Sequence, residues 1–83
     1  MFYVYIIYSH IRKQYYIGHT QNIDERLKRH NSGREKYTKS GLPWELVYTE
    51  TFSTRGEAMI VEKKIKGRGA QRYLETKKRE NRK

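Results

Sequence analysis

Three observations predict a mixed α/β (α+β) domain in which helices flank a small three-stranded antiparallel sheet. Residues 2–8, 15–19 and 45–52 are rich in β-branched and aromatic side chains, which favour strands. Two other segments begin with the pattern of an N-terminal helix cap, followed by spaced apolar residues. With 83 residues, the chain suffices for one compact domain and not for two. The expected order of elements is β-β-α-β-α-α, with residues 1–83 forming a single domain.

The first two strands should pair as an antiparallel hairpin, because only the polar residues 9–14 separate them. Strand alternation places Val4 and Ile6 on one face of the sheet, and Tyr5 and Ile7 on the other.

The first helix should begin at Asn22, a good N-cap residue, with Glu25 completing a capping pattern, and it should end at Gly33. Ile23 and Leu27 are four residues apart and should face the core together.

Residues 34–44, punctuated by Gly41 and Pro43, predict a loop before the third strand. In that strand, alternation places Leu46 and Tyr48 on one side of the sheet.

A T-x-x-E capping box predicts a second helix from Thr54 to about Lys66, which Gly67 and Gly69 should end. A third helix should occupy about 70–79. Residues 76–83 are a basic end that we expect to fray.

Charge gives the first functional indication. Nineteen Lys and Arg against nine Asp and Glu give a net charge of +10, and such a basic domain usually meets a polyanion. Residues 1–62 hold nine basic and seven acidic side chains, a net of +2, whereas residues 63–83 hold ten and two, a net of +8. A charge run of this kind is as often a solvated surface as a binding surface.

The composition also predicts a cytoplasmic protein. The absence of cysteine excludes disulfides and thiolate metal sites and fits a reducing compartment. The start of the chain lacks a basic region and a cleavage site and is expected to form a strand rather than a signal peptide. No apolar run reaches the length of a membrane span, and the last helix has few large apolar residues, so we expect no membrane partner.

Five residues form a constellation that could carry chemistry, although each alone has a structural explanation as a core tyrosine or a solvated helix residue. Arg26 and His30 are four residues apart and share a helix face. The five candidates are Tyr5, Tyr16, Arg26, His30 and Glu62.

The ordered set resembles the GIY-YIG nuclease family, and most closely its small stand-alone bacterial members. The first motif stands here as Tyr3-Val4-Tyr5 and the second as Tyr16-Ile17-Gly18. The run from Arg26 to His30 and the helix that carries Glu62 also resemble the family's pattern. The resemblance covers about residues 1–75.

This resemblance implies a metal-dependent endonuclease that hydrolyses DNA. Glu62 would hold one Mg²⁺ or Mn²⁺ ion, since a hard cation prefers oxygen ligands and keeps most of its waters. Tyr5 would act as general base or position the water, and nearby positive charge from Arg26 should lower its pKa. Tyr16 would hydrogen-bond the phosphate or the water, and His30 could share the proton transfer.

Further residues are expected around this centre. Gly18 would leave room for the backbone beside the site. Nucleic-acid contacts are expected from six residues, which are Lys28, Arg29, Tyr37, Lys39, Lys63 and Lys66.

The chain departs from the family's pattern at two places. Tyr3 replaces the glycine of the first motif. This change could alter the backbone conformation there, but it need not affect the chemistry, because the motif's tyrosine side chain is the working part. The family's late asparagine has no clear counterpart, because Asn81 is nineteen residues past Glu62.

Two functions therefore stay open, an endonuclease and a nucleic-acid-binding module of the same fold that has lost or weakened its cutting activity. As no base-reading element is evident, we expect selectivity for nucleic-acid structure rather than sequence, with a role in DNA repair or recombination. The resemblance favours DNA over RNA, and a protein partner could supply specificity. The sequence does not determine the oligomeric state.

Overall fold

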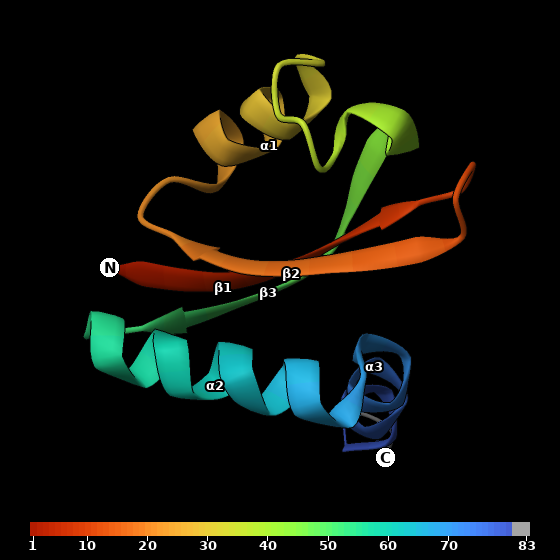
Figure 1. Cartoon of the computed structure of the whole chain (residues 1–83). Helices are drawn as coiled ribbons and strands as arrows, with labels where there is room; N and C mark the ends of the chain where they lie inside the picture. Colours follow the sequence, from red (N-terminus) through yellow and green to blue (C-terminus); the bar gives the residue numbers. More distant parts are fainter. Residues whose placement is uncertain (81–83) are drawn as a thin grey trace.

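The computed structural model describes residues 1–80 and confirms the predicted class and order of elements. The elements are β1 (Phe2–Ser9), β2 (Gln14–Thr20), α1 (Ile23–Asn31), the 3₁₀ helix η1 (Lys39–Gly41), β3 (Trp44–Phe52), α2 (Arg55–Arg68) and α3 (Ala70–Glu80). The strands form one antiparallel sheet in the order β2-β1-β3. Figure 1 shows α1 and the segment after it on one face of this sheet, and α2 and α3 on the other.

The central strand β1 is buried on both faces. Val4 and Ile6 pack on the face that α2 and α3 cover. Tyr5 and Ile7 pack on the face that α1 covers, together with Trp44 at the start of β3. The first cluster has the buried residues Val4, Ile6, Ala58, Ile65, Ala70 and Tyr73, and the second has Tyr5, Ile7 and Trp44. The candidate site is built on the second cluster, so a packed core holds it in place.

The prediction that Leu46 and Tyr48 share one face is wrong because β3 contains a bulge. Ile6 pairs with Tyr48 and Ile7 pairs with Leu46, so Val47 has no partner of its own on β1. One extra residue reverses the alternation beyond it. Leu46 therefore packs in the cluster toward α1, whereas Tyr48 packs toward α2 and α3.

Of the two glycines predicted to end α2, Gly69 does so and Gly67 does not. The Gly69 backbone has φ 96°, and its N–H donates to the carbonyl of Ile65 at 2.8 Å. A position with positive φ needs glycine, whereas Gly67 lies in an exposed helix interior where glycine merely costs propensity.

The helix α3 includes residues 76–80, which the sequence analysis placed in a frayed basic end. The Thr76 hydroxyl donates to the Arg72 carbonyl at 3.0 Å and accepts from the Arg68 side chain at 2.8 Å. The contact with Arg68 ties the second turn of α3 back to the end of α2. The rest of that predicted segment, with Asn81, lies outside the described residues. Within residues 1–80 no helix is long and apolar enough to cross a membrane.

Candidate active site

The centre of the candidate site is a buried tyrosine that contacts a buried histidine. The Tyr5 hydroxyl on β1 lies 2.9 Å from Nε2 of His30, near the end of α1. Tyr16 on β2 packs against both, with ring centroids 6.4 Å from Tyr5 and 4.9 Å from His30. The structure thus brings three of the five predicted residues into contact from three separate elements.

Gly18 creates the space for the Tyr5 side chain. The two residues are paired across β1 and β2, and a Cβ atom at Gly18 would lie 2.5 Å from the Tyr5 hydroxyl oxygen. Any larger residue would displace the ring from the site. The sequence analysis expected Gly18 to leave room for the backbone beside the site, but the space is filled by the tyrosine ring itself.

A chain of hydrogen bonds fixes the proton on His30. The Thr38 hydroxyl lies 3.4 Å from the His30 carbonyl, to which it donates, and 3.3 Å from Nδ1 of the His30 ring. Because the hydroxyl proton is used on the carbonyl, the Thr38 oxygen accepts from Nδ1–H. The Nε2 lone pair of His30 is then free to accept the proton of the Tyr5 hydroxyl.

His30 is held in its neutral form. Burial lowers its pKa below the usual 6.5, and the charge of Arg26 lowers it further. Glu35 acts in the opposite direction and Arg29 adds a smaller decrease. A neutral imidazole at pH 7 is a proton acceptor, which is the role that the hydrogen-bond chain requires.

The expectation of a lowered pKa for Tyr5 is wrong. Burial raises the pKa of its phenol well above the ordinary value of 10, and the neighbouring Tyr16 raises it further. Arg26 does act in the predicted direction but is outweighed, because removing an anion from water costs more than one partly solvated cation returns. Tyr5 is therefore a neutral hydroxyl whose proton points to His30.

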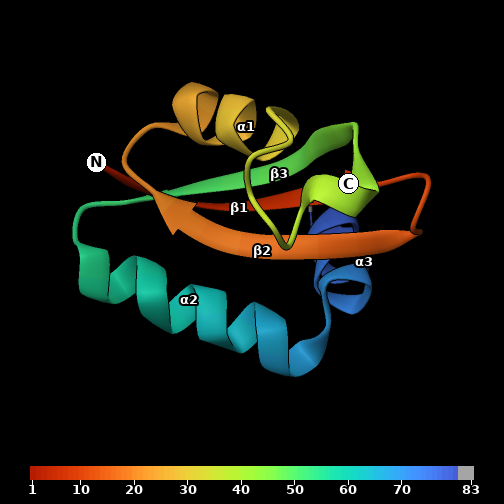
Figure 2. The same cartoon turned by 45° about the horizontal axis from the view of Figure 1, so that its top comes forward.

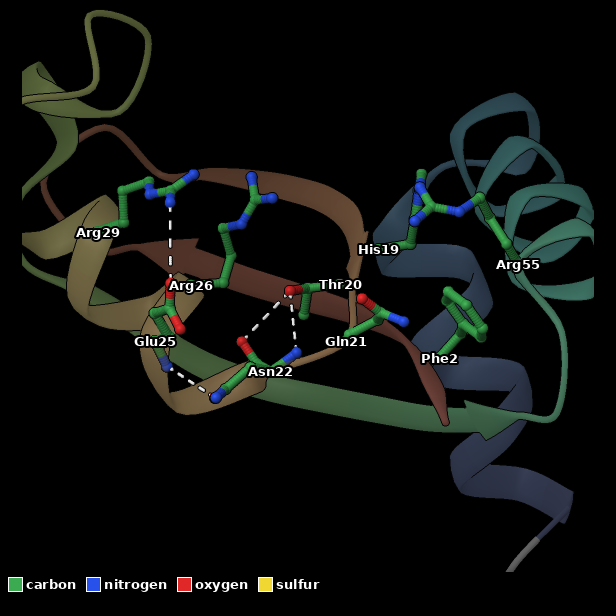
Figure 3. A pocket seen from close by; sticks show the side chains of 9 residues that line it. All are labelled: Phe2, His19, Thr20, Gln21, Asn22, Glu25, Arg26, Arg29 and Arg55. Atoms are coloured by element: carbon green, nitrogen blue, oxygen red, sulfur yellow. Dashed lines mark hydrogen bonds and ion pairs between the residues drawn. The ribbon is translucent and has the colours of Figure 1, made fainter.

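Arg26 joins this centre to a cleft that is lined by three arginines and by Glu25. Tyr5, Tyr16, His30 and Glu62 do not line the cleft, but the charge of Arg26 acts on both Tyr5 and His30. The volume of the cleft is about 280 Å³, and Figure 3 shows Arg26 and Arg29 projecting from α1 while Arg55 extends from the start of α2. Arg29 lies 3.9 Å from carboxylate oxygens of both Glu25 and Glu35, whereas Arg26 and Arg55 form no ion pair within residues 1–80. Guanidinium groups without a carboxylate partner in a cleft suit phosphate oxygens.

Glu62 lies on α2 and does not hydrogen-bond to the tyrosine pair. One carboxylate oxygen contacts His19 of β2 and the other lies 2.7 Å from the Lys66 ammonium. Burial alone would raise the Glu62 pKa, but hydrogen bonds and charge from Lys66 and His19 hold it below its usual value. Glu62 is near enough for its charge to raise the pKa of Tyr5.

An ionised, part-buried carboxylate fits a single hard cation. The side chain of Glu62 is 15% exposed, and the Lys66 ammonium already occupies a cation position against it. Lys66 is 55% exposed and can swing into solvent. Residues 1–80 contain no cluster of three His, Cys, Asp or Glu that could bind a metal, so an ion here would take its remaining ligands from water and phosphate.

The other predicted nucleic-acid contacts are spread around the centre. Tyr37 is 71% exposed and its ring lies 5.5 Å from that of Tyr16. Lys28, Lys39 and Lys63 lie on α1, η1 and α2 respectively. None of these three lies in the arginine-lined cleft.

Sequence reasoning missed three residues of the site. His19 contacts Glu62, Thr38 orients His30, and Arg55 completes the cleft. The position of His19 on the strand face opposite Tyr16 could have been inferred from alternation. Thr38 and Arg55 carried no such signal, because only the folding of the 34–44 segment and the placement of α2 bring them to the site.

The sheet topology, the tyrosine pair and the arginine on α1 together define a GIY-YIG domain. Residues 1–80 match the GIY-YIG catalytic domain, and the chain belongs to that family. Membership in this nuclease family implies that the protein binds nucleic acid.

Among its relatives are small bacterial proteins named UPF0213. One from Bacillus licheniformis is 49% identical over 69 residues, covering 78% of this chain and 71% of the relative. YazA of Bacillus subtilis is 41% identical over 68 residues, covering 77% and 69%. The solution NMR structure of a UPF0213 protein from Bacillus halodurans has a TM-score of 0.55 and 35% identity, covering 92% of this chain and 82% of that one. None of these names states a reaction.

Proposed function

We propose that this protein is a metal-dependent endonuclease that hydrolyses phosphodiester bonds in DNA and selects structure rather than sequence. One observation carries the proposal: the Tyr5 hydroxyl faces a neutral histidine acceptor, and Arg26 joins this pair to an arginine-lined cleft. Arginine contacts to phosphate position a strand without reading its bases. Selectivity for branches or nicks would suit DNA repair or recombination, where a protein partner could choose the target.

The proposed reaction is in-line attack of water on a phosphate held by Arg26. Tyr5 and Tyr16 orient the water. As the water oxygen bonds to phosphorus, its proton passes to the Tyr5 oxygen while the Tyr5 proton moves to Nε2 of His30. The phosphorus bond to the leaving oxygen breaks, and that oxygen takes a proton from solvent. Because no free phenolate forms, the raised pKa of Tyr5 is compatible with this role.

Glu62 would hold one Mg²⁺ or Mn²⁺ once Lys66 has moved away. When bound, the ion would supply positive charge for the phosphate and the leaving oxygen. His19 would keep the remaining carboxylate oxygen in place from β2.

A second candidate function is a binding module with little or no cutting. It is favoured by Glu62, whose two oxygens are both paired with basic side chains, and by the absence of a three-ligand metal cluster within residues 1–80. The arginine-lined cleft supports binding under either function.

A nicking assay separates the two functions. Supercoiled plasmid and a branched oligonucleotide are incubated with the protein and Mg²⁺ or Mn²⁺, with EDTA as a parallel reaction. The wild type should cut. Tyr5→Phe should lose about 10²- to 10⁴-fold in rate, the usual contribution of a general acid–base group, and Glu62→Gln should lose cutting because it removes the carboxylate charge that would hold the metal.

Matched controls guard against unfolding. Tyr3→Phe lies on the same strand outside the tyrosine–histidine cluster, and Glu75→Gln removes a carboxylate from α3; both should cut like the wild type. Cutting that survives in Tyr5→Phe and Glu62→Gln would refute the assigned site. No cutting by the wild type, with DNA binding retained, would favour the binding module.

A further inference from the structure

A second hollow has Tyr37 and Trp44 in its lining, and the rings of both residues lie close to the ring of Tyr16. The hollow has a volume of about 500 Å³ and is lined by Arg12, Gln14, Lys36, Tyr37 and Trp44. Arg12 lies in the β1–β2 connection, and Gln14 and Trp44 are the first residues of β2 and β3. Lys36 and Tyr37 belong to the segment between α1 and β3, which passes over β2 in Figure 2. The proposed reaction uses none of them.

Tyr37 is an exposed aromatic residue on a fixed loop. Its neighbour Thr38 is buried, and the Thr38 carbonyl accepts from the Trp44 indole at 2.7 Å and from the Gly41 backbone at 3.1 Å. A Cβ at Gly41 would lie 2.6 Å from the Trp44 ring, so the turn packs tightly over the indole. An aromatic ring that is 71% exposed yet held by such a loop is preorganised for stacking.

The charge of the hollow is positive. Its lining has two cations, Arg12 and Lys36, and no carboxylate. The Arg12 guanidinium is oriented by Ser40 at 2.7 Å and Gln14 at 3.1 Å, both neutral partners, so its charge is not cancelled. A cation pair around an exposed aromatic ring suits a base with its phosphate, since the ring stacks on the base and the cations meet the backbone.

Tyr16 connects this hollow to the catalytic centre. Its ring centroid lies 5.5 Å from Tyr37, 4.9 Å from His30 and 6.4 Å from Tyr5. A strand whose phosphate sits beside Tyr5 and Arg26 therefore reaches the hollow with an adjacent nucleotide. A base paired in a duplex has both faces stacked on its neighbours and cannot stack on Tyr37 as well.

From this geometry we infer that the hollow around Tyr37 receives an unpaired base of the strand held at the catalytic centre. The inference rests on the proposed function and narrows its substrate class to DNA with an unpaired nucleotide next to the scissile phosphate, such as a flap or a gap. An intact duplex offers no unpaired base to this hollow.

The test is a double-mutant cycle in which the DNA base and the Tyr37 ring are removed separately and together. Binding of flap DNA is measured by fluorescence anisotropy in EDTA and low salt, with an abasic nucleotide placed at each position around the branch. At one position, base removal should weaken wild-type binding about 5- to 100-fold, the usual effect of one base–aromatic stack. The same removal should change the affinity of Tyr37→Leu by less than about twofold, whereas Tyr37→Phe should behave like the wild type.

The outcomes separate this inference from the proposed function. An abasic effect of equal size in the wild type and in Tyr37→Leu, or no effect at any position, would overturn the inference even if the protein cuts DNA. Because binding is measured without metal, a protein that never cuts can still show the coupling. A fully paired duplex should bind Tyr37→Leu and the wild type equally, and a Tyr37-dependent preference for an acidic peptide over the flap would also refute the base as occupant.

Discussion

At the scale of single residues, the site depends on which nitrogen of His30 carries the proton. Thr38 makes this assignment by accepting from Nδ1–H while donating to the His30 carbonyl. Thr38 touches no reacting atom in the proposed reaction and is a positioning residue. It lies in the segment between α1 and β3 and is 1% exposed.

Replacing Thr38 by valine removes the hydroxyl and keeps the shape. The buried Nδ1–H and the His30 carbonyl then lose their partner, which should destabilise the fold by about 1–3 kcal/mol. Thr38→Ser should restore stability and cutting. NMR of the imidazole nitrogens would report the tautomer, and an unchanged Nδ1–H signal in Thr38→Val would contradict this role.

His30 should also make stability depend on pH. Its folded pKa lies below the unfolded value of about 6.5, so the unfolded chain binds the proton more readily. The stabilisation is full above pH 6.5 and declines as pH falls through the folded pKa, by at most about 1.4 kcal/mol per pH unit. The groups whose charges act on His30 are Arg26, Arg29 and Glu35.

Urea unfolding of the wild type and His30→Gln between pH 5 and 8 isolates this effect. Glutamine keeps hydrogen-bonding groups but cannot take up the proton. The wild type should lose stability relative to His30→Gln below pH 6.5, and parallel pH profiles would contradict the depressed pKa.

At the scale of elements, two glycines differ in whether the structure requires them. Gly18 in β2 faces the Tyr5 ring, whereas a Cβ atom added at Gly67 in α2 would meet nothing within 4 Å. The first is needed for a close approach, and the second only lowers the helix propensity of α2.

Substitution by alanine should therefore act in opposite directions. Gly18→Ala forces the Tyr5 ring aside and should destabilise the domain by about 1–3 kcal/mol. Gly67→Ala should stabilise it by about 0.5–1 kcal/mol, which raises the Tm by a few degrees in a domain of this size. Thermal unfolding by circular dichroism measures both, and a stable Gly18→Ala with normal cutting would contradict the packing described here.

At the scale of the whole molecule, the net charge of +10 is carried mostly by surface lysines and arginines. Contacts between these side chains and phosphates release counterions, which makes binding depend on salt. The arginine-lined cleft and the hollow around Tyr37 each concentrate part of this charge.

Affinity for DNA should fall steeply with salt. An interface with about six phosphate contacts loses about 10³-fold in affinity between 50 and 200 mM salt. Arg55→Gln, in the cleft, should reduce the slope of log affinity against log salt by about one. Arg72→Gln, on α3 and outside the cleft, should change it less. A dissociation constant that stays the same across this range would refute a phosphate-based interface.

Much of the fold follows from local pattern. The β-branched and aromatic side chains of residues 2–8 predict a strand, and the cap at Thr54 predicts the start of α2; the structure confirms both. The bulge at Val47 was not predictable, because an apolar residue there fits either register until β1 pairs with β3.

By itself, the sequence determined the class of fold, the order of elements and the family motifs that mark Tyr5, Tyr16, Arg26, His30 and Glu62, because these depend on residue type and spacing along the chain. Tertiary structure alone decided the protonation of the site. The pKa of Tyr5 rises because the ring is buried under α1, and His30 is neutral because it is buried beside the charge of Arg26, with its proton placed by the distant Thr38. Burial and charge act through space, so spacing along the chain cannot report them.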